Sequence, residues 1–501
     1  MALTPAPAQR PSLRPHPHLY EINTWVWLEQ LSAKLGHIIR LGNVPDAEWD
    51  SLARRGFDIV WLMGIWKRSP KSRQYALYDS ANFPQYDRAL PGWKPSDIIG
   101  SPYAVGQYVP DPRIGTWDDL DRAREQLRAR GMRLFLDFVG NHTALDHPWT
   151  HEHPEFYVQG LQQDFEKDPA SFYLAETSKG PSFLALGKDP YFPPWSDVAQ
   201  LNHFQMEMRA ALIDDLRMIA NHCDGVRCDM AMLQLNDIFL RTWGRLLNSA
   251  SSPKREFWSE AHGSVPDLIL LAEAYWGTEP RLLDLGFSFA YDKELYDAVR
   301  DGKIAEIRSR LGAAYSYQSR LARFLENHDE KRCPVAFGKR LPSARTIMAT
   351  LPGMRLYHQG EEAGCEIQMP LTLRMPASTP PDPESVKFFT TIFSITNEEV
   401  FHHGQWDLLQ TMPEGDSTSE NLIAWEWRAE ASWRIVVVNL ADSASQGRIL
   451  LGDRAKPGGE YIFHDLLSEI RYPRVGSELH EQGLFVRLEE YQAHLFDVTL
   501  A

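Results

Sequence analysis

Four apolar segments of this 501-residue sequence end in clusters of ionisable and polar side chains. The clusters are Asp137 with Asn141 and His142, Arg227 with Asp229, Glu273, and Asn327 with His328 and Asp329. An acid at the end of a strand can simply cap the next helix. Four such acids with arginine, histidine or asparagine nearby are instead typical of a catalytic site.

Carboxyl groups arranged in this way favour cleavage of a glycosidic bond with retention of configuration. That reaction needs two carboxyl groups about 5–5.5 Å apart, one to attack the anomeric carbon and one to protonate the leaving oxygen. Neighbouring parallel strands lie about 4.8 Å apart, so acids that end adjacent strands can meet this spacing. We assign Asp229 as the nucleophile, Glu273 as the acid and Asp329 as a group that stabilises the oxocarbenium-like transition state.

The residues beside these acids suit the same roles. In GVRCDM the two-residue period of a strand puts Arg227 and Asp229 on one face, where opposite charge keeps Asp229 ionised. Cys228 then faces the other way, toward the helices, as a small buried residue. Glu273 follows the apolar run LILLA, and partial desolvation there would raise the pKa of its carboxyl group, as a general acid requires.

The elements that must position these residues follow from the hydrophobic pattern. The first two-thirds of the chain alternate short apolar runs with helical patterns, which predicts parallel strands joined by helices. Gly56–Ile65 and Leu268–Trp276 are expected strands, and Thr116 is placed to cap a helix that Gly131 ends. We therefore predict an α/β fold, a (β/α)8 barrel with its chemistry at the carboxyl ends of the strands.

Two long excursions interrupt this pattern of strands and helices, and the residue pattern changes again near residue 370. The 62 residues from Ala144 to Gln205 are too many for an ordinary loop and predict a small inserted domain, while Lys67–Gly100 form the second excursion. Beyond Phe401 short strands follow without helices, which predicts an antiparallel β-sandwich. The expected division is a flexible lead-in (1–18), the barrel in two parts (19–143 and 206–370), the inserted domain (144–205), a linker with the last barrel helix (371–400) and the C-terminal sandwich (401–501).

Composition and charge exclude several classes of protein. The 52 basic and 67 acidic residues give a net charge of −15, which repels nucleic acid and anionic membrane surfaces. The sequence has no apolar run long enough for a membrane span, and its first residues lack the apolar core of a secretion signal. Four cysteines without CxxC spacing favour a reducing compartment, so we expect a cytoplasmic protein. The histidine-rich segment 147–153 lacks HExxH spacing, so we expect a solvated or packed loop there and no metal site.

Seven short segments, in order along residues 20–370, resemble the alpha-amylase superfamily (glycoside hydrolase family 13). DFVGNH (137–142), GVRCD (225–229), AEAYW (272–276) and FLENHD (324–329) are similar to its four conserved regions. Further similar segments are SPYAVGQYVPDPRIGT (101–116), SDVAQLN (196–202) and LPGMRLYHQGEE (351–362). The resemblance implies a barrel with an inserted domain B and a β-sandwich domain C.

The resemblance also implies a role for each matching residue. Asp229 corresponds to the nucleophile, Glu273 to the general acid/base and Asp329 to the transition-state stabiliser. Arg227 corresponds to the arginine that orients the nucleophile. The remaining matches are His142 and His328, which bond the sugar in the first glycone subsite, Tyr103, which is its aromatic platform, and Asn141, which often binds calcium.

Four positions depart from the family pattern. Met232 and Leu233 replace a Lys-His pair that serves the aglycone subsites and sometimes calcium, so we expect no required cofactor and disfavour a structural calcium ion. Ala104 and Gln107 replace two aspartates found in many exo-glucosidases of the family, so ordinary amylases and ordinary exo-glucosidases both fit imperfectly. A group of aromatic side chains lies in and beside the 67–100 excursion: Trp66, Tyr75, Tyr78, Tyr86 and Trp93. They could stack on sugar rings or simply pack the loop, and both interpretations stay open.

The predicted function is a retaining glycoside hydrolase that cleaves α-glucosidic bonds of oligosaccharides, with α-linked glucosides as its partners and neither nucleic acid nor membrane. A transglycosylase or phosphorolytic member of the same superfamily is one alternative, in which a sugar or phosphate replaces water. A non-catalytic carbohydrate-binding or partner protein is another, disfavoured because such relatives usually lose the catalytic acids. A barrel enzyme of other chemistry is the third, disfavoured because the sequence contains no cofactor motif.

Overall fold

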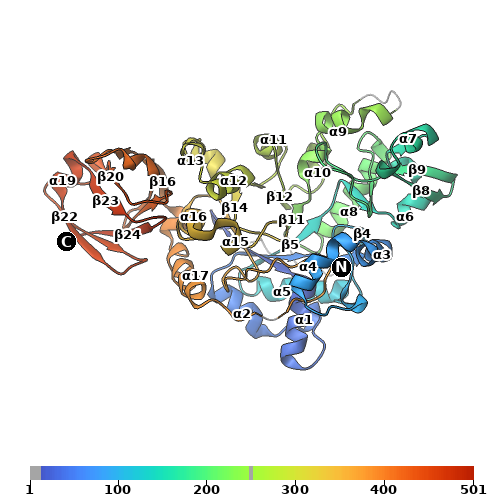
Figure 1. Cartoon of the computed structure of the whole chain (residues 1–501), viewed down its shortest axis with the longest axis horizontal. Helices are drawn as coiled ribbons and strands as arrows, with labels where there is room; N and C mark the ends of the chain where they lie inside the picture. The colour runs from blue at the N-terminus through green and yellow to red at the C-terminus, as the bar shows by residue number, and fades with distance from the viewer. Residues whose placement is uncertain (1–12, 248–251, 378) are drawn as a thin grey trace, which may run out of the picture.

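The structure is a computed structural model that describes residues 13–247, 252–377 and 379–501, so the first twelve residues of the predicted lead-in lie outside it. Figure 1 shows three parts along the long axis of the molecule. A barrel lies in the middle, the segment that interrupts it lies at one end, and a C-terminal β domain lies at the other. No helix in the described ranges is long and apolar enough to cross a membrane.

Parallel strands close into an eight-stranded barrel, and the predicted α/β barrel fold is confirmed. Every residue of the strand Ile59–Met63 is buried, because one face fills the barrel and the other packs against helices. This strand and Ile269–Ala272 are shorter than the predicted runs 56–65 and 268–276. In order around the barrel the strands are β1 (His18–Asn23), β15 (Met354–His358), β14 (Leu321–Arg323), β13 (Phe289–Tyr291), β12 (Ile269–Ala272), β11 (Gly225–Cys228), β5 (Arg133–Phe138) and β2 (Ile59–Met63).

Helices follow the strands and cover the outside of the barrel. The longer ones are α1 (Thr24–Leu35), α2 (Asp46–Arg54), α5 (Trp117–Arg128), α8 (Met206–Ala220), α9 (Asn236–Trp243), α10 (Phe257–Ser264), α12 (Lys293–Asp301), α13 (Ile304–Leu311), α16 (Leu341–Thr350) and α17 (Pro383–Thr396). Shorter ones are α11 (Glu279–Asp284), α14 (Tyr315–Gln318) and α15 (Cys333–Phe337). The predicted cap of α5 is confirmed, since the Thr116 hydroxyl accepts a hydrogen bond from the Asp119 N–H, and Gly131 follows the helix with a φ of 77°.

The segment predicted as an inserted domain is folded. It leaves the barrel through β6 (His142–Ala144) and returns through β10 (Val198–Gln200), and these two strands pair with each other. Between them lie a three-stranded sheet of β7 (Gln159–Gly160), β9 (Gly180–Ala185) and β8 (Phe172–Thr177) and the helices α6 (Pro148–Glu152) and α7 (Gln162–Lys167). Phe172 and Ala185 of this sheet pack with Phe239 and Trp243 of α9, which ties the insertion to the barrel.

The 67–100 excursion holds β3 (Trp66–Arg68), α3 (Pro70–Tyr78) and α4 (Phe83–Ala89), and β3 pairs with β4 (Val105–Pro110). Trp66 and Tyr86 are each 1% exposed, and Trp93 packs against the cluster that contains Tyr86. Loop packing is therefore the right interpretation for these three aromatic side chains. Tyr75 and Tyr78 are exposed.

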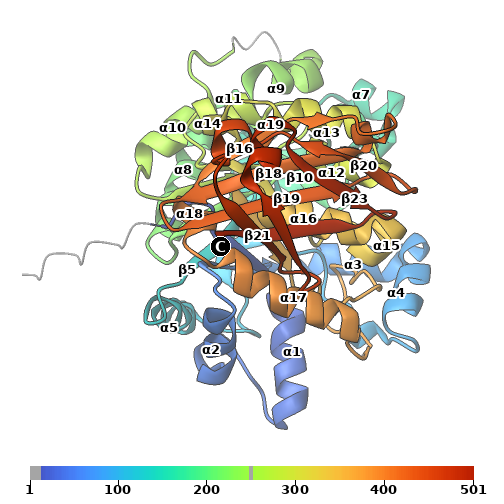
Figure 2. The same cartoon turned by 90° about the vertical axis from the view of Figure 1, so that its left-hand side faces the viewer.

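The C-terminal part, after α18 (Val400–His403), is an antiparallel sandwich as predicted (Figure 2). One sheet contains β16 (Gln405–Leu409), β18 (Leu422–Ala429), β19 (Ser432–Asn439), β24 (Ala493–Leu500), β21 (Glu460–Asp465) and β22 (Arg471–Val475). The other contains β17 (Thr411–Met412), β20 (Ser445–Ile449) and β23 (Leu484–Leu488), with α19 (Gly476–Glu481) beside them. Ile435 and Phe463 of the first sheet share a core with Ile449 and Val486 of the second.

Candidate active site

The predicted acids come together at the carboxyl ends of neighbouring barrel strands. Arg227 lies in β11, Asp229 follows that strand directly, and Glu273 follows the adjacent strand β12. Asp329 lies beyond the end of β14. The carboxyl ends of parallel barrel strands meet at one face of the barrel, so side chains far apart in the sequence share one site there.

Arg227 joins the three carboxyl groups. Its Nη1 lies 2.7 Å from Asp229 Oδ1, and its Nη2 lies 2.8 Å from Glu273 Oε2 and 3.9 Å from Asp329 Oδ2. The Arg227 side chain is fully buried, so its guanidinium cannot turn away into water. One fixed cation therefore sets the positions of two carboxylates from adjacent strands, as the alternation of the GVRCD strand predicts for Arg227 and Asp229.

The three acids have different electrostatic surroundings. Burial raises the pKa of Glu273 to about 7, against the opposing effect of Arg227. Burial also raises the pKa of Asp229, which Arg227 counteracts by charge and by a hydrogen bond. Desolvation would raise the pKa of Asp329, but the neighbouring His328 cation outweighs it and holds this pKa below its usual value. Glu273 is thus the acid that carries a proton most readily near neutral pH.

Two donors fix one oxygen of Glu273 and leave the other for a proton. The Met230 N–H donates to Oε2 over 2.6 Å, and Arg227 Nη2 also faces Oε2. The Tyr275 hydroxyl lies 2.7 Å from Oε1. Because Oε2 already faces two N–H groups, Oε1 is the oxygen that holds the proton of the neutral carboxyl group.

His328 sits between two carboxylates. Its Nδ1 lies 2.5 Å from Glu21 Oε1, and its Nε2 lies 3.0 Å from Asp329 Oδ2 and 2.7 Å from the Tyr103 hydroxyl. Burial alone would lower the pKa of His328, but the charges of Asp329 and Glu21 raise it well above its usual value. The Tyr103 ring stacks on the imidazole at 5.1 Å, and Arg227 lies 5.2 Å from the centre of that ring.

Sequence reasoning missed Glu21 and Tyr275. Glu21 is fully buried in β1, and a lone acid within the run HLYEIN was a signal that could have found it. Tyr275 lies in the segment AEAYW, but no local pattern indicates which group its hydroxyl contacts. The fourth predicted acid, Asp137, accepts a hydrogen bond from the Gly64 N–H at 2.8 Å and so ties β5 to the loop after β2.

His142 lies next to this cluster. It is 5% exposed, its ring packs against Trp195 of the insertion at 5.2 Å, and burial lowers its pKa to about 4. A hydrogen bond links it to the backbone of Tyr103. Tyr103 thus contacts both Arg227 and His328 directly, and His142 joins them through the Tyr103 backbone.

The surroundings of Asn141 do not fit a calcium ion. Asn141 Oδ1 accepts a hydrogen bond from Gln200 Nε2 at 3.0 Å, and Asn141 Nδ2 donates to Gln200 Oε1 at 3.3 Å. Calcium prefers six to eight oxygen ligands with several carboxylates among them. Within the described ranges, no three histidine, cysteine or acidic side chains gather as metal ligands, in 147–153 or elsewhere.

The two sides of the site differ in character. A pocket of about 490 Å³ adjoins His328 and Asp329, and Gln85 and Arg88 of α4 and Gln368 also line it. On the side of Glu273, three aromatic side chains are exposed: Tyr191 (61%), Phe192 (67%) and Trp276 (38%). Tyr191 and Trp276 pack edge to face at 4.9 Å, and Trp276 has a φ of 62°. Met232 and Leu233, where the family often has Lys-His, are buried.

Cys228 faces away from the site, as strand alternation predicts. It is fully buried, and burial raises the pKa of its thiol well above the usual value, so the thiol stays protonated and unreactive.

The fold and the site define a (β/α)8-barrel protein with a cluster of three carboxyl groups around one arginine at the carboxyl face of the barrel. Residues 50–224 match the family model "Alpha amylase, catalytic domain". This match covers about a third of the chain, which over these residues is similar to the catalytic domain of alpha-amylases.

Individual relatives match over part of their length. The chain is 27% identical over 267 residues to "Alpha-amylase MalA" of Haloarcula japonica, a match that covers 50% of this chain and 34% of that protein. It is 24% identical over 304 residues to "Probable oligo-1,6-glucosidase 2" of Bacillus subtilis, covering 50% and 53%. The chain thus spans between a third and about half of the length of these curated relatives.

Among solved structures, a noncanonic maltogenic alpha-amylase, AmyB from Thermotoga neapolitana, has a TM-score of 0.67 with 18% identity, and the match covers 97% of this chain and 99% of that one. At this identity the likeness concerns the fold.

Proposed function

We propose that this protein is a retaining enzyme that acts on α-glucosidic bonds by double displacement. One observation carries the proposal: Arg227 binds Asp229 and Glu273 from adjacent strands, with Asp329 on the third side of the same guanidinium. A nucleophile and an acid held at adjacent strand ends are what a retaining mechanism requires.

In the first step, Glu273 donates the proton on Oε1 to the glycosidic oxygen, and the bond from that oxygen to the anomeric carbon breaks. Asp229 Oδ1 is held by Arg227, which leaves Oδ2 to form the new bond to the anomeric carbon. Asp329 and the His328 cation would bind hydroxyl groups of the same sugar, with Tyr103 beneath its ring. The negative charge of Asp329 favours the oxocarbenium-like transition state over the neutral substrate.

In the second step, the Glu273 carboxylate takes a proton from the acceptor, whose oxygen attacks the anomeric carbon and releases Asp229. Two inversions at the same carbon return the original α-configuration. The acid of the first step is the base of the second, and a pKa of about 7 suits both roles near neutral pH.

A sugar acceptor in place of water is the second candidate function. The exposed aromatic pair Tyr191 and Trp276 lies on the side of Glu273, where a leaving group departs and an acceptor enters. Aromatic faces stack on sugar rings and retain them after cleavage. Transfer to a second sugar is therefore favoured over phosphorolysis, which would need cations at this position.

The test is a panel of α-linked di- and oligosaccharides followed by proton NMR, with and without added sugar acceptors or phosphate. Early release of the α-anomer supports the retaining mechanism, whereas early release of the β-anomer contradicts it. The Asp229→Asn variant should lose at least about a thousandfold in kcat because the nucleophile is gone. Asp237→Asn, which alters an exposed acid paired with Arg281, is the matched control and should keep full activity.

A cytoplasmic location is part of the same proposal. Cys228, Cys333 and Cys365 form no disulfide in the structure, which suits a reducing compartment. Cell fractionation tests it, and recovery of the protein only from the medium would contradict it.

A further inference from the structure

Three neighbouring barrel strands place basic side chains side by side in the interior. The register pairs His18 of β1 with Arg355 of β15, and Arg355 with Arg323 of β14. His18 is fully buried, and Arg323 and Arg355 are each 1% exposed. Like charges directly opposite each other in a sheet repel, and a buried charge without a counter-charge destabilises the fold by several kcal/mol.

The hydrogen-bond partners of these arginines are neutral, and the acids Asp58 and Asp292 act on them only by charge. Arg355 donates to the carbonyl oxygens of Leu351 and Phe401 and to His18 Nε2, all of which are neutral. The pKa of His18 lies well below its usual value through burial and the nearby Arg355, so His18 itself is uncharged.

Arg323 has one acid near it. Its Nη1 lies 3.6 Å from Asp292 Oδ2, beyond hydrogen-bond distance, and its Nη2 contacts the neutral amide of Gln318. The Nε and Nη1 atoms of Arg323 are buried and have no hydrogen-bond partner among the described residues.

A small cavity lies against this row, between the barrel wall and the helices α16 and α17. Arg323, Arg355 and Tyr357 line it from the strands, and Arg345 lines it from α16. The Nε of Arg345 and the hydroxyl of Tyr357 are also buried without a described partner. Arg345 Nη2 donates to the Ser385 hydroxyl, which carries no charge.

Glu361 is the one carboxyl group on the described wall of this cavity. Burial and the charge of Glu326 raise its pKa well above the usual value, which favours the neutral form of this carboxyl group. Glu326 is itself paired with Arg332. The cavity is therefore lined by three guanidinium groups and by hydrogen-bond donors, and the Asp292 carboxyl group lies 3.6 Å from Arg323 Nη1.

We infer that this cavity binds one monatomic anion of the halide class, held by Arg323, Arg345 and the Tyr357 hydroxyl. Its volume of about 10 Å³ admits about one water-sized sphere and excludes carboxylate, phosphate and sulfate. The donors present exclude a cation. A water molecule would also fit, but it is neutral and would not compensate the positive charge of the buried guanidinium groups. The negative charge of a halide ion would compensate it.

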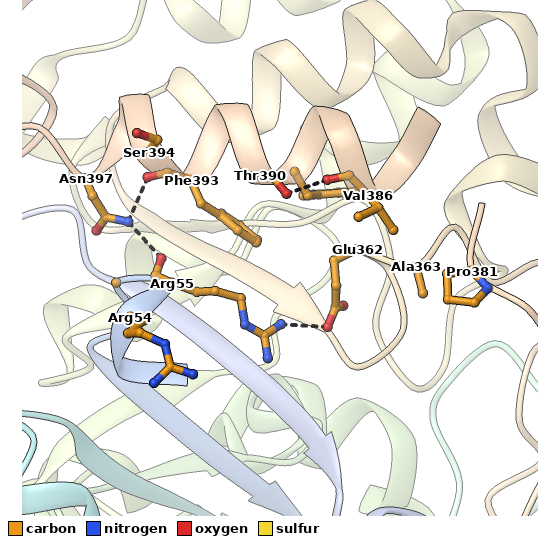
Figure 3. Close-up of a pocket in the computed structure, with 12 residues that line it drawn as sticks. Arg54, Arg55, Glu362, Ala363, Pro381, Val386, Thr390, Phe393, Ser394 and Asn397 are labelled. Atoms are coloured by element: carbon orange, nitrogen blue, oxygen red, sulfur yellow. Dashed lines mark hydrogen bonds and ion pairs between the residues drawn. The ribbon is translucent and has the colours of Figure 1, made fainter. Parts of the chain in front are cut away.

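The anion site differs from the candidate active site in place and in residues, because it lies on the helix side of the barrel wall and shares none of the catalytic groups. Phe389 of α17 borders both this cavity and an open pocket of about 670 Å³. Figure 3 shows that pocket, with the ion pair of Arg55 and Glu362 on its wall. Phe389 is thus shared by the cavity and by a solvent-facing hollow.

The test measures thermal unfolding of the full chain while chloride replaces gluconate at constant ionic strength. Gluconate is too large for the cavity, so a bound chloride should raise the melting temperature saturably by about 2 °C or more. Arg323→Met should abolish this dependence, and the matched control Arg308→Met should keep it, because Arg308 binds backbone carbonyl oxygens of Glu420 and Leu422 far from the cavity.

Crystals soaked in bromide give a second measurement that needs no variant. An anomalous peak between Arg323, Arg345 and Tyr357 supports the proposal even where Arg323→Met does not fold. Absence of that peak, or equal melting temperatures in chloride and gluconate, would overturn the proposal and leave water as the occupant.

Discussion

The Tyr275 hydroxyl offers a direct test of the proton-transfer role of Glu273. It donates to Glu273 Oε1 over 2.7 Å, and burial keeps the pKa of Tyr275 well above its usual value, so the hydroxyl stays protonated across the working range. A donor to a carboxylate favours the charged form. Tyr275→Phe keeps the ring and removes the donor, so the pKa of Glu273 should rise.

The size of the shift follows from hydrogen-bond strengths. A bond to a charged acceptor contributes about 1.5–3 kcal/mol and one between neutral groups about 0.5–1.5 kcal/mol, so the ionised form loses about 1–1.5 kcal/mol more. At 1.36 kcal/mol per pKa unit, that is about one unit. The pKa of Glu273 should move from about 7 to about 8.

The assay is the pH dependence of kcat/KM, which reports pKa values of the free enzyme. Glu273 must be protonated for the first step, so activity falls as the pH rises through its pKa. At pH 8 the protonated fraction should rise from about one tenth to about one half, so the variant should keep about five times more of its maximal activity than the parent. Tyr108→Phe is the control, because that buried hydroxyl binds the Val139 carbonyl oxygen instead. An alkaline limb that stays in place or moves to lower pH would refute the role of Glu273.

Three further predictions concern the surroundings of the acids. Glu21→Gln should lower kcat/KM about 5–30-fold by weakening the charged hydrogen bond to His328. Glu362→Gln is the control, because Glu362 pairs with Arg55 instead. If Glu21→Gln and Glu362→Gln both leave kcat/KM unchanged, His328 does not depend on Glu21. Trp276→Ala should reduce transfer to sugar acceptors more than hydrolysis, measured as the product ratio by NMR, whereas an equal loss of both would contradict an acceptor platform at that residue. Removal of divalent cations with a chelator should leave activity and melting temperature unchanged, because Gln200 already satisfies the Asn141 amide; a loss restored by calcium would contradict this.

The sequence was most informative where short-range periodicity sets the geometry. Strand alternation placed Arg227 and Asp229 on one face and Cys228 on the other, and the cap at Thr116 located the start of α5. Such features depend on neighbouring residues alone, so they can be read without knowing the fold. The aromatic side chains of the 67–100 excursion were ambiguous, because an exposed stacking surface and a packed loop have the same composition. The burial of Trp66 and Tyr86 in the structure shows that these two side chains pack the loop.

The sequence by itself determined the barrel class, the carboxyl groups at its strand ends and the buried position of Cys228. Tertiary structure alone decided which groups touch those acids. Glu21 and His328 are 307 positions apart, and only closure of the barrel brings β1 beside the end of β14. It also decided the charge states, because the pKa of Glu273 depends on how deeply its carboxyl group is buried and how near Arg227 lies. The row of His18, Arg355 and Arg323 likewise arises from strand register, which sets long-range neighbours that no local pattern specifies.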